Sequence, residues 1–356
     1  MNDFTKALSA AICGKADAAL ILSEANRFYY TGFPASDGAL LVTAAGAIFY
    51  TDSRYTEAAI RKLGEQYVRN SAAMYSDLTA EFEKQGVKTV AIEADRLTLA
   101  EFANLQNKLP DVTFISDATL TDLIEAQRSI KTPEEIEKMT AAQRIAEAAF
   151  DHILGFIKPG VTEKEVGLEL DYYMLSHGAD GLSFETIAVS GVNSSLPHGV
   201  PSEKKIEIGD FVTMDYGAIK DGYHSDMTRT IAVGKVSDEQ KLVYETVLKA
   251  QLASLRLFKA GVSCFDGDKA ARDVIREAGY GDYFGHGTGH GVGVEIHEFP
   301  RVSPASKTIL QAGHVVTAEP GIYLPGKFGV RIEDMALITE TGCIDITNCP
   351  KELIVL

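Results

Sequence analysis

The sequence predicts a mixed α/β (α+β) protein with two domains: a small N-terminal α/β domain and a larger domain that contains an internal repeat. Three observations predict this fold class. Strand and helix patterns alternate through the first third of the chain, a helix-capping sequence follows at residues 132–135, and two similar stretches then recur about 100 residues apart. The length of 356 residues is enough for two domains of ordinary size.

The first domain is expected to span residues 1–128. Its first residues predict an amphipathic helix and no signal peptide, because Asp3 is acidic and the apolar run that follows is short. Another helix is predicted from Asp52, as its cap, to Leu63, and one more over Thr98–Leu109. Strands are predicted at residues 18–23, 38–42, 47–51, 87–93 and 112–115.

The second domain is expected to span residues 129–356. Thr132-Pro-Glu-Glu135 is a capping box with proline at the first helical position, and it predicts a helix to about Ile157, which Pro159-Gly160 ends. Thr162 and Ser263, 101 residues apart, each open a further helix after a Gly-Val pair. A duplicated unit is the simplest account of this spacing.

Acidic residues recur in the same register. Asp215 and Asp226 flank a predicted hairpin whose turn is Asp221-Gly222. Glu319 follows Asp215 by 104 residues, and Glu333 follows Asp226 by 107. Two facing halves would gather these four acids around one pseudo-twofold axis. Solvated acids at strand ends are the alternative, but aspartate is depleted in strands, so burial beside a cation is the better explanation.

The stretch from Gly285 to His297 contains three histidines and five glycines. So many glycines indicate that the backbone approaches another group closely. A phosphate-binding loop is disfavoured because no lysine follows the glycines. His290 adds a nitrogen ligand to the four carboxylates, and this oxygen-rich set suits two divalent ions that activate water.

Composition excludes some partners. The net charge of −16 argues against nucleic acid or an anionic membrane as the main partner. Outside the N-terminal segment, the most apolar run is residues 38–50, and it is too short to span a membrane. Four cysteines without a C-x-x-C pair indicate free thiols in a cytoplasmic protein.

These segments resemble the pita-bread metallopeptidases, the family of methionine aminopeptidase, aminopeptidase P and prolidase. The similar stretches in the second domain are SLPHGVP, MDYGAIKDGYHSDMTRT, GHGTGHGVGVEIHE, TAEPGIY and GVRIEDMALIT. In the first domain, NRFYYTGFPASDGALLVT and FYTDSRY resemble the creatinase-type N-terminal domain of the Xaa-Pro branch. Methionine aminopeptidases generally lack that domain, so an activity like theirs is the weaker match.

The resemblance implies roles for individual residues. Asp215 would bind one metal, His290 and Glu319 the other, and Asp226 and Glu333 would bridge both. Glu319 would also act as general base for a hydroxide that bridges the metals. Four further residues would hold the substrate. His198 and His297 would bind its carbonyl oxygen, and His286 would line the pocket on the proline side. Arg331, near the metals, would orient the substrate or its carboxylate.

The implied activity is that of an Xaa-Pro aminopeptidase or Xaa-Pro dipeptidase, a metallo-exopeptidase that acts on peptides with proline at the second position. Mn²⁺ is the first choice of metal, with Co²⁺, Zn²⁺ or Fe²⁺ as alternatives, and the family habit is a homodimer. Two readings from other classes remain: a non-catalytic binding or chaperone module, and a metal-free creatinase-like hydrolase. The complete ligand set counts against both.

Overall fold

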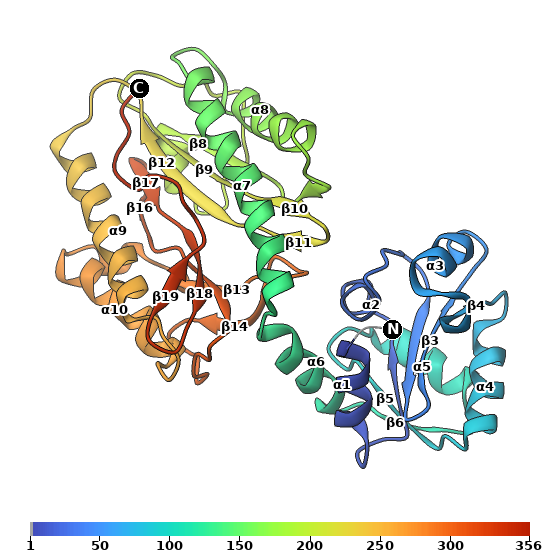
Figure 1. The fold of residues 1–356 in the computed structure, drawn as a ribbon. Helices are drawn as coiled ribbons and strands as arrows, with labels where there is room; N and C mark the ends of the chain where they lie inside the picture. The colour runs from blue at the N-terminus through green and yellow to red at the C-terminus, as the bar shows by residue number, and fades with distance from the viewer. Residues whose placement is uncertain (1–2) are drawn as a thin grey trace. The chain divides into compact units, whose positions relative to one another are not determined.

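The computed structural model describes residues 3–356, which divide into two compact units, Met1–Arg128 and Ser129–Leu356. Figure 1 shows a mixed sheet with surrounding helices in the first unit and two pairs of helices around strands in the second. The mixed α/β fold class is confirmed. Within residues 3–356, no helix combines the length and the apolar character needed to cross a membrane.

The first unit is built around one sheet with the strand order β4-β3-β2-β1-β5-β6. The strands are β1 (Ala18–Ile21), β2 (Ala39–Thr43), β3 (Gly46–Thr51), β4 (Val68–Asn70), β5 (Thr89–Ile92) and β6 (Thr113–Ile115). The helices are α1 (Asp3–Ile12), α2 (Glu24–Thr31), α3 (Thr56–Leu63), α4 (Met74–Gln85), α5 (Leu99–Lys108) and α6 (Thr119–Ser129). The short turn η1 (Glu65–Tyr67) precedes β4.

The prediction that Asp52 caps a helix is wrong. The helix begins four residues later, at Thr56, and its N-cap residue Tyr55 makes no side-chain capping bond. The Asp52 carboxylate instead accepts hydrogen bonds from the backbone and guanidinium of Arg54. Helices α2 and α4 were not anticipated from the sequence, because neither opens with a side-chain cap and only α2 has a residue typical of one.

The second unit contains two long helix pairs. They are α7 (Pro133–Phe156) with α8 (Glu163–Ser176), and α9 (Asp238–Leu257) with α10 (Cys264–Glu277). The predicted caps are confirmed: Thr132 and Thr162 close capping boxes, and the Ser263 hydroxyl accepts from the Asp266 amide. Each of these three caps satisfies otherwise free N–H groups of its helix, which is why the sequence located the helix starts so well.

The strands of the second unit lie between the two helix pairs (Figure 1). One sheet has the order β12-β9-β8 and another the order β14-β13-β15-β18-β19. The strands of these two sheets are β8 (Ile187–Ser190), β9 (Phe211–Tyr216), β12 (Met227–Ala232), β13 (Gly289–Gly291), β14 (Glu298–Val302), β15 (Val315–Ala318), β18 (Asp334–Ile338) and β19 (Cys343–Asp345). Smaller pieces are β7 (Gly181–Leu182), β10 (Ala218–Lys220), β11 (Tyr223–His224), β16 (Gly321–Leu324), β17 (Phe328–Arg331), η2 (Gly191–Ser195) and η3 (Gly281–Tyr283).

Apolar packing joins each helix pair to its strands. Phe150, Leu170 and Met214 belong to a buried core between α7, α8 and β9, and Val247, Ala271 and Val330 to one between α9, α10 and β17. These cores hold rigid strands whose ends carry polar side chains.

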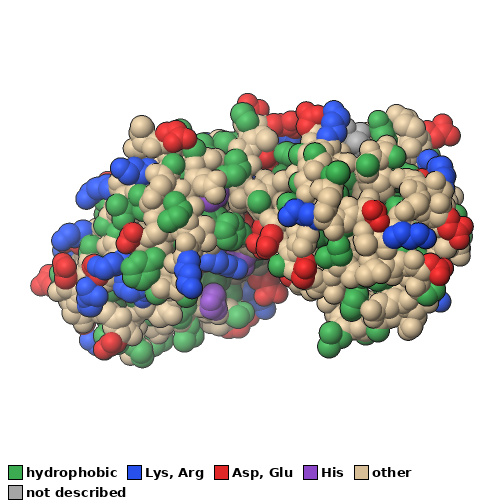
Figure 2. All heavy atoms as spheres, turned by 90° about the horizontal axis from the view of Figure 1, so that it is seen from below, with side chains coloured by type: hydrophobic (Ala, Val, Ile, Leu, Met, Phe, Trp, Pro, Cys, Tyr) green, Lys and Arg blue, Asp and Glu red, His purple; other side chains and the backbone are tan. Residues whose placement is uncertain are grey.

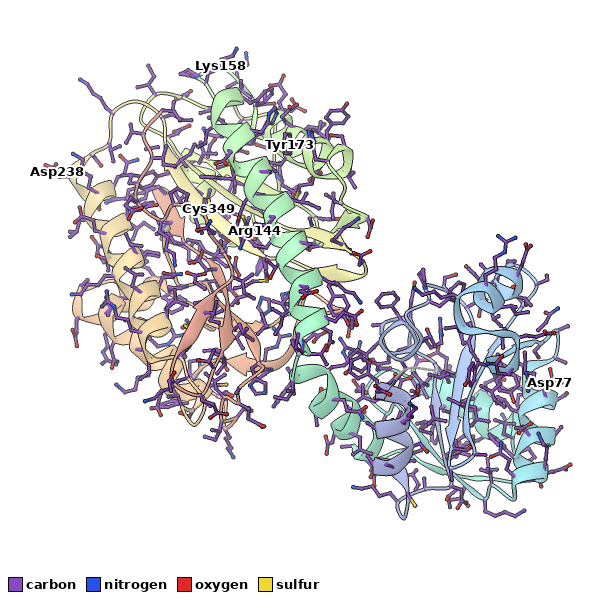
Figure 3. All side chains as sticks on the ribbon, viewed as in Figure 1. Asp77, Arg144, Lys158, Tyr173, Asp238 and Cys349 are labelled. Atoms are coloured by element: carbon purple, nitrogen blue, oxygen red, sulfur yellow. The ribbon has the colours of Figure 1, made fainter. Side chains whose placement is uncertain are left out.

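The C-terminal segment and the surface complete the second unit. Arg144 on α7 donates from Nη2 to the Ile346 carbonyl at 2.8 Å, which ties the segment near Cys349 to that helix (Figure 3). On the face seen in Figure 2, acidic, basic and apolar side chains are interspersed. Although the chain has a net charge of −16, its acidic side chains do not form a single patch on that face.

Candidate metal centre

Five side chains from the second unit line one cavity of about 600 Å³, and we call them the ligand cluster: Asp215, Asp226, His290, Glu319 and Glu333. Each lies in or beside a strand. Asp215 is in β9 opposite Thr228 of β12, and Asp226 directly precedes β12. Glu319 directly follows β15, Glu333 directly precedes β18, and His290 is the middle residue of β13.

Backbone hydrogen bonds fix where these strand ends meet. The Glu319 amide donates to the Thr288 carbonyl at 2.7 Å, and the Glu333 amide donates to the Thr228 carbonyl at 3.1 Å. The second of these bonds joins a strand of the first half to a strand of the second half. The two predicted acid pairs therefore come together where the two halves meet.

The glycines beside His290 are required by close packing. A Cβ atom at Gly289 would lie 2.0 Å from the Thr317 carbonyl oxygen, and one at Gly291 would lie 2.4 Å from the Phe299 carbonyl oxygen. Strand β13 is thus squeezed between β14 and β15. Only glycine fits on either side of His290, which explains part of the glycine density in the sequence.

Ligand atoms of the cluster lie within reach of a shared ion. One ligand atom each from Asp226, His290 and Glu333 lie within 4.8 Å of one another. His290 Nε2 is 3.5 Å from Asp226 Oδ2 and also 3.5 Å from Glu319 Oε1. The fifth residue, Asp215, binds Arg331 through Oδ2, while its buried Oδ1 has no hydrogen-bond partner among the described residues.

Burial and mutual repulsion disfavour the charged forms of the carboxylates. The pKa of Asp226 lies well above its usual range because the group is buried and faces Asp215 and Glu319. The pKa of Glu333 is raised well above its usual range, mainly because the group is buried and then because of repulsion from Asp226 and Glu319. Burial raises the pKa of Glu319 to about 8 and lowers that of His290 to about 3, so the imidazole is neutral.

This donor set fits divalent metal ions. Four carboxylates and a neutral imidazole are the ligands that Mn²⁺, Co²⁺, Zn²⁺ or Fe²⁺ accept. The one guanidinium that binds the cluster, Arg331, cannot balance four negative charges. The unpaired Oδ1 of Asp215 is a buried acceptor that requires a cation or a donor. The residues present thus match the requirements of a metal centre on charge, on donor type and on geometry.

The other predicted site residues also line the cavity: His198, His286, His297 and Arg331. His297 packs edge-on against His290, with ring centroids 4.4 Å apart. The ring of His286 lies between the Gly287 carbonyl and the Tyr323 hydroxyl, 2.8 and 2.9 Å from its two nitrogens. His198 is exposed in the loop after β8, and no hydrogen bond holds its imidazole among the described residues.

Arg331 is buried and fully engaged. Its guanidinium donates to Asp215 Oδ2 at 2.6 Å and to the Tyr323 hydroxyl at 2.9 Å. It also donates to the Pro197 carbonyl and to the Thr228 hydroxyl. Thr228 in turn donates to Glu333 Oε2 at 2.7 Å. Arg331 therefore orients Asp215 and, through Thr228, Glu333, which leaves little of it for a substrate carboxylate.

Arg301 is a cavity residue that the sequence analysis missed. It lies in β14, exposed, and no hydrogen bond holds its guanidinium among the described residues. Burial alternates along β14, with Phe299 and Arg301 outward and Pro300 and Val302 inward. Residues 298–302, Glu-Phe-Pro-Arg-Val, show no regular apolar and polar alternation, so no local pattern indicates that Arg301 faces the cavity.

The apolar wall of the cavity contains none of the four aromatic residues that lie close to the metal-site motifs in the sequence, Tyr216, Phe284, Phe299 and Tyr323. Tyr216 is buried in the core, where its hydroxyl donates to the Ala146 carbonyl. The apolar lining comes from other residues, namely Phe184, Ile187, Pro197, Val200, Pro201 and Ile296.

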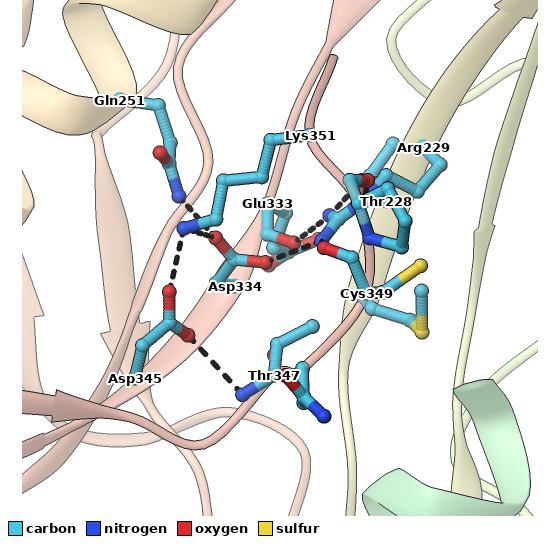
Figure 4. Close-up of polar contacts among 12 residues, drawn as sticks. Thr228, Arg229, Gln251, Glu333, Asp334, Asp345, Thr347, Cys349 and Lys351 are labelled. Atoms are coloured by element: carbon cyan, nitrogen blue, oxygen red, sulfur yellow. Dashed lines mark hydrogen bonds and ion pairs between the residues drawn. The ribbon is translucent and has the colours of Figure 1, made fainter. Parts of the chain in front are cut away.

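A second buried polar group lies beside the ligand cluster and does not line the cavity; we call it the salt-bridge cluster: Arg229, Gln251, Asp334, Asp345 and Lys351 (Figure 4). Arg229 donates to Asp334 Oδ1 at 2.7 Å and to the carbonyls of Glu333 and Thr228 at 2.7 and 2.9 Å. Gln251 and Lys351 bind the other oxygen of Asp334. The salt-bridge cluster thus supports the same point at which the backbones of Thr228 and Glu333 meet, on the side away from the cavity.

Comparison with known proteins places this geometry in context. Residues 137–340 match metallopeptidase family M24, and residues 6–130 match the creatinase/prolidase N-terminal domain. The Xaa-Pro dipeptidase of Pyrococcus horikoshii is 39% identical over 341 residues, which cover 95% of this chain and 94% of that protein.

Solved structures agree with the sequence matches. An Xaa-Pro dipeptidase from Bacillus anthracis has a TM-score of 0.95 and 43% identity, with 99% of each chain covered. An X-Pro aminopeptidase from Thermotoga maritima has a TM-score of 0.90 and 38% identity, with 96% of this chain and 98% of that chain covered.

Proposed function

The chain belongs to metallopeptidase family M24, and on this premise we propose that it is an Xaa-Pro dipeptidase that uses two divalent metal ions. The observation that carries the proposal is the cavity itself, which is lined by the ligand cluster, by three further histidines and by Arg301. The relatives named as Xaa-Pro dipeptidases support the choice of substrate. The homodimer remains a prediction from the resemblance, and the cytoplasmic location remains a prediction from the cysteine pattern.

The ligand cluster would hold both ions, and Mn²⁺ is our first choice. When bound, the ions supply Lewis acidity and a water of lowered pKa, so that hydroxide is available near neutral pH. All other steps fall to side chains. Arg331 and Thr228 keep Asp215 and Glu333 oriented, as their hydrogen bonds require.

Glu319 is the proposed general base. Its carboxylate is part of the cavity lining and lies 3.5 Å from His290. It takes a proton from the attacking water as the new C–O bond forms, and it delivers that proton to the proline nitrogen as the C–N bond breaks. His198 and His297 would donate hydrogen bonds to the carbonyl oxygen as negative charge develops on it.

The substrate's proline suits this cavity. An Xaa-Pro amide has no N–H, so the site needs no acceptor at that position. Apolar side chains such as Phe184, Ile187 and Ile296 offer a wall for the pyrrolidine ring. Arg301, whose exposed guanidinium has no hydrogen-bond partner within residues 3–356, would bind the free carboxylate of the proline in a dipeptide.

Substrate length tests this proposal. We expect the Mn²⁺-loaded protein to hydrolyse an Xaa-Pro dipeptide with a kcat/KM about tenfold or more above that for its C-terminal amide, since a charged hydrogen bond contributes ~1.5–3 kcal/mol. Arg301→Gln should remove that preference. Lys307→Gln, which removes a nearby exposed charge outside the cavity, is the matched control.

The outcomes separate the alternatives. Faster cleavage of an Xaa-Pro-Xaa tripeptide than of the dipeptide would indicate aminopeptidase P activity, which the Thermotoga relative's name suggests. If neither peptide is cleaved with Mn²⁺, Co²⁺ or Zn²⁺ supplied, the enzymatic proposal fails. Unchanged selectivity in Arg301→Gln would leave the dipeptidase activity standing but would remove the proposed role of Arg301.

A further inference from the structure

We propose that Glu163 is a positioning residue that closes the loop of residues 190–202 and thereby sets the place of His198 in the cavity. The inference rests on the proposed function, in which His198 contacts the substrate. Glu163 is the first residue of α8, is 1% exposed and lies outside the cavity lining. Neither the metal centre nor the sequence motifs account for its burial.

The two oxygens of Glu163 hold the two ends of this loop. Oε1 accepts from the backbone N–H and the hydroxyl of Ser190, at 2.6 and 3.0 Å. Oε2 accepts from the backbone N–H and the hydroxyl of Ser202, at 3.1 and 2.6 Å. Asn193 Nδ2 lies 3.1 Å from both oxygens. One carboxylate therefore joins the start and the end of a 13-residue loop.

The same loop forms one wall of the cavity. The residues at its tip, Pro197 to Pro201, line the cavity, and His198 is among them. Because no hydrogen bond holds the His198 imidazole among the described residues, the loop backbone determines where this ring lies. From the cavity side the loop has other contacts: Arg331 donates to the Pro197 carbonyl, and the Gly329 amide donates to the Ser194 hydroxyl.

The charge of Glu163 matters as much as its shape. An ionised carboxylate only accepts hydrogen bonds, and here all its partners are donors. Glutamine has nearly the same shape, but its NH₂ group would face the donors at one end of the loop. Leaving buried donors without an acceptor is costly, so Glu163→Gln should release one end of the loop while α8 stays folded.

The second half of the unit holds its histidine segment in a similar way. Asp268 of α10 accepts from the Thr288 amide at 3.0 Å and from the Thr288 hydroxyl at 2.9 Å. Thr288 directly precedes β13, the strand that contains His290. In both halves, a buried acid from the second helix of the pair fixes the histidine-bearing segment. This parallel supports a positioning role for Glu163 over a merely structural one.

The test compares Glu163→Gln with Glu165→Gln. Glu165 is two residues further on, completes the Thr162 capping box and does not touch the loop, so it is a matched control. Glu163→Gln should speed hydrogen exchange of the Ser190 and Ser202 amides, and it should lower kcat on an Xaa-Pro dipeptide about 10- to 100-fold with little change in KM. Glu165→Gln should change neither.

A double-mutant cycle separates positioning from general damage. In a His198→Ala background, Glu163→Gln should lower kcat no further, because its effect acts through His198. Additive losses would overturn the proposal, and so would unchanged exchange of the loop amides. If Glu163→Gln does not fold, Ser202→Ala removes the 2.6 Å hydroxyl bond and is measured in the same way.

The exchange measurement needs no substrate. If the wild-type protein cleaves no Xaa-Pro peptide, the proposed function fails while the exchange data still test the closure of the loop. If cleavage is normal and loop exchange is unaffected by Glu163→Gln, only the present inference fails.

Discussion

The ligand cluster and the salt-bridge cluster adjoin each other at Glu333 and Asp334, which are consecutive in the chain, yet the charges of the two clusters are balanced differently. Glu333 lines the cavity, whereas Asp334, the next residue, binds Arg229 on the other side. Asp334 and Asp345 are matched by Arg229 and Lys351, so the salt-bridge cluster carries two charges of each sign. The ligand cluster sets four carboxylates against one guanidinium, that of Arg331.

Burial alone therefore does not identify a metal site. Asp334 is completely buried and Glu333 is 1% exposed, so exposure does not distinguish them. What distinguishes the ligand cluster is negative charge that the protein itself does not neutralise, together with an acceptor, Asp215 Oδ1, that has no partner among the described residues. A buried pair with its own counter-charges needs no ion.

The largest expected effect comes from Glu319→Gln in the ligand cluster. The variant keeps the size of the side chain and removes the proposed base, so kcat should fall about 10³-fold or more while circular dichroism and Tm stay close to wild type. Steady-state kinetics on an Xaa-Pro dipeptide measures this. Glu340→Gln, at an exposed position, is the control. Retained turnover would remove Glu319 from the mechanism.

Asp334→Asn should give the largest loss of stability. It leaves the guanidinium of Arg229 buried without its counter-charge, and breaking a buried pair in this way costs about 3–5 kcal/mol. Urea unfolding measures the free energy of unfolding. Lys6→Gln, which breaks an exposed ion pair in the first unit, should leave the free energy of unfolding nearly unchanged. Equal effects of the two variants would contradict the comparison.

The metal-free protein should lose stability as pH rises. The folded-state pKa of Glu319 is raised from 4.5 to about 8, so its contribution is fully present below pH 4.5 and is lost as pH rises through about 8. Asp226 and Glu333 act in the same direction. The buried histidines act in the opposite direction only below their ordinary pKa of 6.5, so Tm measured with a chelator should fall as pH rises from about 6.5 through 8, and saturating Mn²⁺ should offset the fall. A metal-free Tm that is independent of pH would contradict the proposed charge imbalance.

A smaller effect is expected from Thr228→Val, which removes the 2.7 Å hydrogen bond to Glu333 and keeps the shape of the side chain. Loss of such a supporting contact should weaken Mn²⁺ binding about tenfold. Isothermal titration calorimetry gives the affinity. Thr246→Val in α9, where the hydroxyl donates to the Leu242 carbonyl, is the matched control. Equal affinities in the two variants would show that Thr228 does not support the site.

Local sequence patterns encode hydrogen bonds that are made within a few residues. Capping residues such as Thr132 and Thr162 predict where helices start, because their hydrogen bonds are made within four residues. Helices without such caps, as α4 shows, went unnoticed. The position of Arg301 and the closure of the loop by Glu163 depend on residues far apart in the chain, so no local pattern reveals them.

The sequence alone is sufficient to predict the fold class and the starts of the main helices. Through the spacing of its repeat, it also predicts which acidic residues occupy equivalent positions in the two halves. It could do so because capping and strand patterns are local and a duplicated unit repeats its residues in register. Only the tertiary structure decided that these acids share one cavity, that Arg331 is occupied by Asp215, and that Asp334 is neutralised by Arg229. The reason is physical: whether a buried charge is balanced depends on which distant side chains the fold brings within hydrogen-bond distance.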